Sequence, residues 1–126
     1  MCSVDVVIMY TNCPIDELLS AVRISYDQFD KSDCKIKCLP TDDLIYLLRS
    51  ILENNIFDFN GQLYKQRIGA AIGAVPSPEI CDILMNKIMK EILYKHDKFE
   101  HRKNIFFYGR YSDDIILIYI MAIRRK

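Results

Sequence analysis

The chain has 126 residues, of which 51% are hydrophobic and 27% charged, a composition typical of one small folded domain and not of a disordered segment. Its 17 Lys and Arg residues equal its 17 Asp and Glu residues, so the zero net charge counts against a protein that attracts nucleic acid through its overall field. The five cysteines follow no disulfide-framework spacing, which indicates free thiols in a reducing compartment.

The sequence gives little support for a zinc site or a membrane segment. Cys34 and Cys38 are four residues apart without a second ligand pair, and His96 and His101 are expected to be solvated in a charged turn. The N-terminal residues lack the basic segment of a signal peptide. The longest apolar run, residues 115–123, is shorter than the roughly 20 residues that cross a bilayer, so we expect no membrane partner.

The first predicted elements are a strand and a helix. Residues 4–10, with the sequence VDVVIMY, are rich in β-branched side chains and predict a buried strand. Asp5 stands in this apolar stretch. An unpaired carboxylate is unfavourable inside a buried strand, so Asp5 either marks the end of the strand or has a functional role. Pro14 opens a helix over residues 15–29, in which apolar side chains recur at helical spacing.

A second helix and a hairpin follow. Thr41 is a plausible N-cap, and the two aspartates after it favour the first turn of a helix that runs through residues 44–55. Asn60 and Gly61 stand between two short alternating apolar runs in residues 56–66, which is the strongest short-range signal for a β-hairpin.

A glycine-rich stretch, residues 67–78, precedes a long predicted helix over residues 79–96. Ser77 can cap this helix, with Pro78 at its first position. Four apolar residues at helical spacing form one stripe that is expected to face the core: Ile80, Leu84, Ile88 and Ile92.

The last predicted element is a β-hairpin with two acids at its tip. Residues 105–111 and 115–123 are apolar strands, joined by Ser112, Asp113 and Asp114. The two carboxylates repel each other, so we expect a positive group beside them, and Mg²⁺ suits their hard oxygen atoms. The alternative is a solvated turn, in which Asp is common. The acid in the first strand favours the cation, because two-metal phosphoryl transfer needs carboxylates from different strands at one edge of a sheet.

Three segments, in order, resemble motifs A, B and C of a reverse transcriptase palm: DVVIMYTNCP, YKQRIGAAIGAVPSP and RYSDDI. The sequences of these segments, together with the hairpin sequence FNGQLYKQ, are most similar to those of Penelope-like retroelements. The resemblance covers residues 4–119. It implies an α/β (α+β) fold, a polymerase palm with an antiparallel sheet backed by helices, and one partial reverse transcriptase domain over residues 1–126.

The resemblance assigns catalysis and metal binding to three aspartates. Asp5 matches the motif A acid that binds both metal ions, and Asp113 matches the second essential ligand, the first acid of motif C. Asp114 matches the supporting acid, and Tyr111 is expected to pack near the primer end. Tyr10 matches the aromatic gate whose ring fills the space that a 2′-hydroxyl would need; an ordinary core aromatic is the alternative.

Other matches lie near the nucleotide and template. Gly73, Ser77 and Pro78 match the motif B loop, where glycine lets the backbone approach the nucleotide closely. A simple helix-capping loop is the alternative for these three residues. Gln66 and Gly69 match the Penelope-like extension of the same loop and complete the expected substrate contacts.

The resemblance implies an RNA-directed DNA polymerase that uses two Mg²⁺ ions, or Mn²⁺, to add deoxynucleotides to a DNA primer on an RNA template. It further implies an intracellular, nuclear protein. Fingers and thumb are expected to lie outside this sequence, so the chain alone is expected to be inactive. Two alternatives stay open: a non-catalytic retroelement remnant that binds RNA or a partner through exposed sheet, and an RNA-dependent RNA polymerase, which usually carries a second acid where Tyr10 stands.

Overall fold

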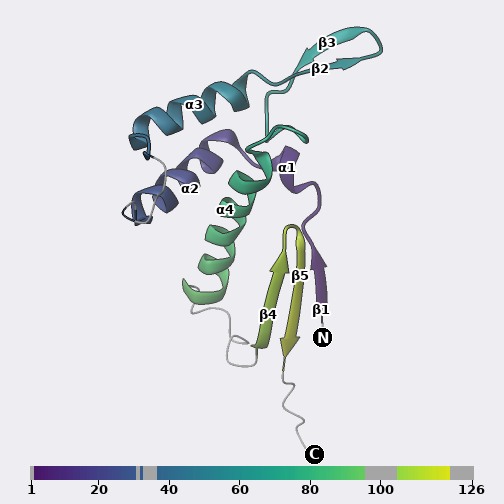
Figure 1. Ribbon diagram of the computed structural model, residues 1–126. Helices are drawn as coiled ribbons and strands as arrows, with labels where there is room; N and C mark the ends of the chain where they lie inside the picture. The colour runs from purple at the N-terminus through teal and green to yellow at the C-terminus, as the bar shows by residue number, and fades with distance from the viewer. Residues whose placement is uncertain (1, 31, 33–36, 96–104, 120–126) are drawn as a thin grey trace, which may run out of the picture. The chain divides into compact units, whose positions relative to one another are not determined.

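The structure, a computed structural model, describes residues 2–30, 32, 37–95 and 105–119. The chain divides into two compact units, one made of Met1–Met9 with Ile88–Lys126 and the other of Tyr10–Lys87. The first unit contains a three-stranded antiparallel sheet, and the second contains most of the helical residues with a two-stranded antiparallel sheet (Figure 1). The expected combination of antiparallel sheet and helices is therefore present in the described residues.

The first unit contains a three-stranded antiparallel sheet in the order β1-β5-β4. Its strands are β1 (Cys2–Asp5), β4 (Ile105–Tyr111) and β5 (Asp114–Tyr119), and they lie side by side in Figure 1. Sequence neighbours β4 and β5 form the predicted terminal hairpin, closed by the pair Tyr111 and Asp114. Ile115 on the central strand is buried. The tip of this hairpin lies where β1 ends.

The strand predicted over residues 4–10 is wrong in its length and its burial. β1 begins at Cys2 and ends at Asp5, Ile8 has a φ of 55°, and Met9–Asn12 form the short helix α1. The partner strand sets this limit, because β5 begins at Asp114 and leaves no backbone for a longer β1 to pair with. β1 is also an edge strand, so most of its side chains are exposed.

The second unit contains two helices that pack together, α2 (Ile15–Gln28) and α3 (Thr41–Glu53). Exposed ion pairs join them, Arg23 with Asp42 and Arg49 with Asp16. A third helix, α4, spans Ser77–Lys90 and is continued by one π-helical turn, Glu91–Lys95. The buried residues of the second unit come mainly from these helices: Leu18, Leu19, Ala21, Val22, Leu48, Leu52, Ala70, Ile80, Cys81, Leu84 and Met85.

The predicted caps Thr41 and Ser77 are not caps. Each is the first helical residue, because the carbonyl of the proline before it accepts the first helical hydrogen bond, Pro40 from Leu44 and Pro76 from Ile80. Thr41 instead donates its hydroxyl to Asp27 across the α2–α3 pair, at 2.7 Å. The Ser77 hydroxyl is buried without a hydrogen-bond partner.

The predicted hairpin around Asn60 and Gly61 is confirmed. Strands β2 (Ile56–Phe59) and β3 (Gln62–Lys65) pair antiparallel around these two residues, whose φ values are 55° and 76°. Left-handed conformations at both central positions are those of a type I′ turn, which suits the twist of the strands. Every residue of both strands is exposed.

The predicted apolar stripe on α4 is buried only in part. Ile80 and Leu84 belong to the core, whereas Ile92 lies in the π-helical turn and is 36% exposed. No helix in the described ranges is long and apolar enough to cross a bilayer. The predictions for Cys34, His96, His101 and the end of the apolar run at 120–123 fall outside the described residues.

Candidate functional site

The structure brings the backbones of the three predicted metal ligands together at one end of the three-stranded sheet. Asp5 is the last residue of β1, and its cross-strand partner is Asp114, the first residue of β5. Paired antiparallel residues have Cα atoms about 4.5–5.5 Å apart and share a face of the sheet. Asp113 precedes Asp114 in the turn, and its carbonyl accepts a hydrogen bond of 3.1 Å from Val6.

These pairings place three of the predicted site residues in one row. Tyr111 on β4 pairs with Asp114, which pairs in turn with Asp5, so all three side chains lie on one face. Asp5 and Asp114 are exposed, and Tyr111 is 85% exposed. Asp113 is half-buried in the turn. The row therefore presents two carboxylates and a phenol to solvent at the sheet end.

Carboxylates at this end suit a hard divalent cation. Mg²⁺ is commonly held by only one or two carboxylates, with water and substrate phosphate as its other ligands. Asp5, with Asp113 or Asp114, provides that number from adjacent strands. Among the residues that the structure describes, no group of three or more His, Cys, Asp or Glu side chains is arranged to hold a metal ion by itself. Substrate or water would have to complete the coordination.

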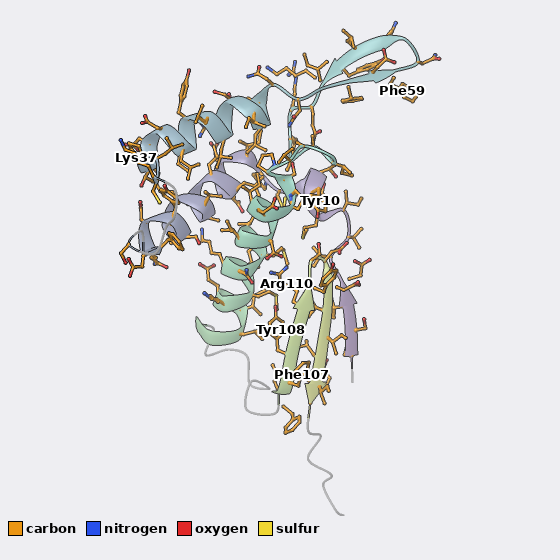
Figure 2. All side chains as sticks on the ribbon, in the orientation of Figure 1. Tyr10, Lys37, Phe59, Phe107, Tyr108 and Arg110 are labelled. Carbon is orange, nitrogen blue, oxygen red and sulfur yellow. The ribbon has the colours of Figure 1, made fainter. Side chains whose placement is uncertain are left out.

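Arg110 is a residue of this site whose role the sequence did not reveal. Its guanidinium donates a hydrogen bond of 2.6 Å to the carbonyl of Ser112, in the turn that carries Asp113. Ser112 has a φ of 53°, a left-handed conformation that is strained for a residue with a side chain. Arg110 is labelled on β4 in Figure 2. Its bond holds the backbone of the turn from one side.

Tyr10 belongs to the second unit, where its segment contacts the glycine-rich loop. The backbone carbonyl of Tyr10 accepts a hydrogen bond of 2.7 Å from Ala70. Gly69 has a φ of 79°, and a Cβ added there would lie 2.5 Å from Thr11 and Tyr10 backbone atoms. Only glycine fits such an approach. The segments that resemble motifs A and B thus touch at this point, while the role of Tyr10 as a gate stays a prediction.

The other predicted substrate contacts have mainly local partners. The Gln66 side chain donates to the Ile68 carbonyl at 2.8 Å and lines a surface pocket of about 410 Å³ with residues of α3 and β3. Gly73 has a φ of 97° and open space where a Cβ would stand. Pro78 is exposed, whereas Ser77 is buried. Contact of these four residues with nucleic acid stays a prediction.

Comparison of the chain with protein-family models, with curated proteins and with solved structures found no match.

Proposed function

We propose that the chain is the palm of an RNA-directed DNA polymerase of the Penelope-like type, acting in the nucleus on an RNA template and a DNA primer. The order of the three motif-like segments supports the proposal. The observation that carries it is the pairing of Asp5 with Asp114 beside the Asp113 turn, since these acids are distant in sequence and come from separate motifs.

Asp5 and Asp113 would hold the two Mg²⁺ ions, and Asp114 would support them. When bound, the ions activate the primer 3′-hydroxyl and stabilise the leaving pyrophosphate. The chain's own contribution is positioning. Asp5 is fixed by the β1–β5 pairing, and Asp113 by its carbonyl bond to Val6. Carboxylates held on a sheet and a short turn need little reorganisation during the reaction.

The structure adds a distinction between the two motif C acids. The residue directly opposite Asp5 is Asp114, whereas the resemblance gives the essential role to Asp113. The Asp113 side chain lies in the turn, where the strand alternation does not determine its direction. The variants Asp113→Asn and Asp114→Asn therefore separate the two assignments.

Primer extension on poly(rA) with an oligo(dT) primer tests the proposed reaction. We expect no polymerisation by the 126 residues alone, and Mg²⁺-dependent extension once the chain is joined to fingers and thumb segments of a Penelope-like polymerase. Asp113→Asn should abolish extension, while Asp43→Asn, an exposed acid of α3, should not alter it. Absence of extension by the joined protein, folded and able to bind primer, would refute the proposal.

A non-catalytic remnant is the second candidate, and the exposed apolar side chains of the sheet favour it. Phe106 is 74% exposed and Phe107 50%, and Ile116 on the central strand is 45% exposed. Apolar side chains in such positions attract a protein partner or RNA bases. A remnant would bind Mn²⁺ no better than its Asp5→Asn variant, whereas a polymerase palm would lose affinity on that substitution.

A further inference from the structure

One face of the β2–β3 hairpin carries three aromatic rings. Phe57 and Phe59 are two residues apart on β2, and Tyr64 on β3 is the cross-strand partner of Phe57, so the three side chains share a face. The Phe57 ring is stacked on Tyr64 with 5.6 Å between the ring centroids, and Phe59 meets the same ring edge-on at 6.4 Å. We call these three rings the aromatic cluster; Figure 2 labels Phe59 on the hairpin.

The aromatic cluster is open to solvent. The exposed fractions of its three residues lie between 43% and 67%. The aliphatic side chains of the hairpin, Ile56 and Leu63, and its one acid, Asp58, alternate onto the opposite face. The cluster therefore presents rings to solvent without an aliphatic or acidic side chain of the two strands on the same face.

The same face continues to a pocket at the base of the hairpin. The N–H of Gln66 donates to the carbonyl of Asn55 at 2.9 Å, one residue beyond the paired strands, so Gln66 continues the alternation of Tyr64. Gln66 lines the pocket of about 410 Å³ together with Lys65 and Arg67. The aromatic cluster and the pocket are thus joined through Gln66.

Two cations of this pocket are available to an anion. Neither Lys65 nor Arg67 forms an ion pair within the described residues, whereas Glu53, the acid of the pocket, is paired with Arg49 at 2.9 Å. Because the chain has no net charge, an anion would be attracted here by these two local charges and not by an overall field. Exposed rings beside unpaired cations suit a ligand that combines planar rings with negative charge.

We propose that the aromatic cluster, with Lys65 and Arg67, binds single-stranded nucleic acid. Bases stack on the exposed rings, and the two cations neutralise phosphates along the strand. A duplex hides the faces of its bases, so only a single strand fits. Neither contact reads the 2′-hydroxyl, and RNA and DNA strands should therefore bind alike. The inference goes beyond the proposed reaction and does not rest on it, because this site contains none of the three aspartates.

The competing occupant is a protein, because aromatic side chains are also enriched at protein interfaces. Charge favours the nucleic acid. The core of a protein interface is depleted in lysine, whereas Lys65 and Arg67 stand without an ion pair among the described residues at the end of this surface. The opposite face of the hairpin, with Ile56 and Leu63, has no rings and provides an internal control.

Fluorescence anisotropy of a labelled oligo(rU) of about 12 nucleotides, titrated with the full chain in the presence of a chelator, tests the proposal. We expect saturable binding, the same affinity for oligo(dT), and competition by single strands but not by duplex. Phe59→Ala should weaken binding at least about fivefold, because a stacked base loses its ring. Phe59→Tyr keeps the ring and should bind like the wild type, as should Leu63→Ala on the opposite face.

The charge contacts are tested by the salt dependence of binding. Lys65→Gln and Arg67→Gln should each reduce the magnitude of the slope of log affinity against log salt concentration by about 0.7, the value for one phosphate of a single strand. Both substitutions leave the rings in place. Lys90→Gln, which removes an exposed cation of α4, should not change the slope.

Asp5→Asn should bind the strand as the wild type does, so this result is independent of the proposed polymerase centre. The proposal is overturned if the chain does not bind oligo(rU), or if duplex binds as tightly as the single strand. It is equally overturned if a folded Phe59→Ala variant keeps the wild-type affinity, which would assign the aromatic cluster to a protein partner.

Discussion

At the scale of single residues, Gly69 is a position where the backbone geometry and the neighbouring atoms allow only glycine. Its φ of 79° already disfavours a side chain, and the Thr11 and Tyr10 backbones occupy the space of a Cβ. Gly73 shares the left-handed backbone, with a φ of 97°, but has open space around it. The two glycines therefore separate the cost of conformation from the cost of contact.

We predict that Gly69→Ala destabilises the protein more than Gly73→Ala. The first substitution forces backbone apart and should cost about 3 kcal/mol of unfolding free energy. The second meets only conformational strain and should cost about 1 kcal/mol. Urea denaturation of both variants provides the values. Equal losses would show that the close approach of Gly69 to residues 10 and 11 does not exist in solution.

The buried thiol of Cys81 gives a pH dependence. Its pKa is raised from 9.0 to about 12 in the folded chain, chiefly by burial. Below pH 9 both states are protonated and stability is complete; above it the unfolded chain ionises first, so stability falls as pH rises toward 12. Relative to Cys81→Ala, wild type should lose about 2–3 kcal/mol between pH 8 and pH 11, in urea titrations with a reductant. A constant difference would contradict the burial of this thiol.

At the scale of elements, the hairpin β2–β3 is the least supported part of the second unit. All its residues are exposed, and its own aromatic contacts are Phe57 stacked on Tyr64 and Phe59 edge-on to the same ring. A two-stranded hairpin without a covering layer is marginally stable in water. Its hydrogen bonds should therefore open without unfolding of the helices.

We predict that amides of β2 and β3 exchange with deuterium at least about tenfold faster than those of Leu84 and Met85 on α4, after correction for intrinsic rates. The buried side chains of α4 hold its amides closed, whereas every residue of β2 and β3 is exposed in the part of the chain that the structure describes. Hydrogen-exchange mass spectrometry or NMR measures both sets at once. Equal protection would mean that another surface covers the hairpin in solution.

Elements governed by local chemistry were predictable from sequence, and those governed by distant partners were not. Asn60 and Gly61 specify their turn directly, so that hairpin follows from two residues. The prolines at 40 and 76 took the cap positions expected for Thr41 and Ser77. The length of β1 depends on where β5 begins, which the residues around Asp5 do not encode.

The candidate site also contains features that were predictable from the local sequence and features that were not. Asp113 in the turn of the terminal hairpin was predictable, because a turn between two apolar strands is a local feature, but Asp114, which was also expected in that turn, is the first residue of β5. The bond from Arg110 to Ser112 was not predictable, since it depends on a side-chain position that no spacing in the sequence specifies. The sequence motifs therefore predict which residues belong to the site, but not the hydrogen bonds that hold the turn.

At the scale of the whole molecule, the two compact units separate the predicted roles. Asp5, Asp113 and Asp114 belong to the first unit, and Tyr10 with the glycine-rich loop belongs to the second. Metal binding by the three aspartates therefore requires only the three-stranded sheet of the first unit. It can be measured without nucleic acid or nucleotide. This makes the cation the most direct probe of the central claim.

The decisive measurement is a Mn²⁺ titration of the chain followed by electron paramagnetic resonance of the free ion. We predict that Asp5→Asn and Asp113→Asn each weaken binding at least about tenfold, with a smaller loss in Asp114→Asn and none in Asp43→Asn. The double variant should lose little more than either single one, because both acids serve the same ions. Binding by Asp5→Asn equal to that of the wild type would contradict the account.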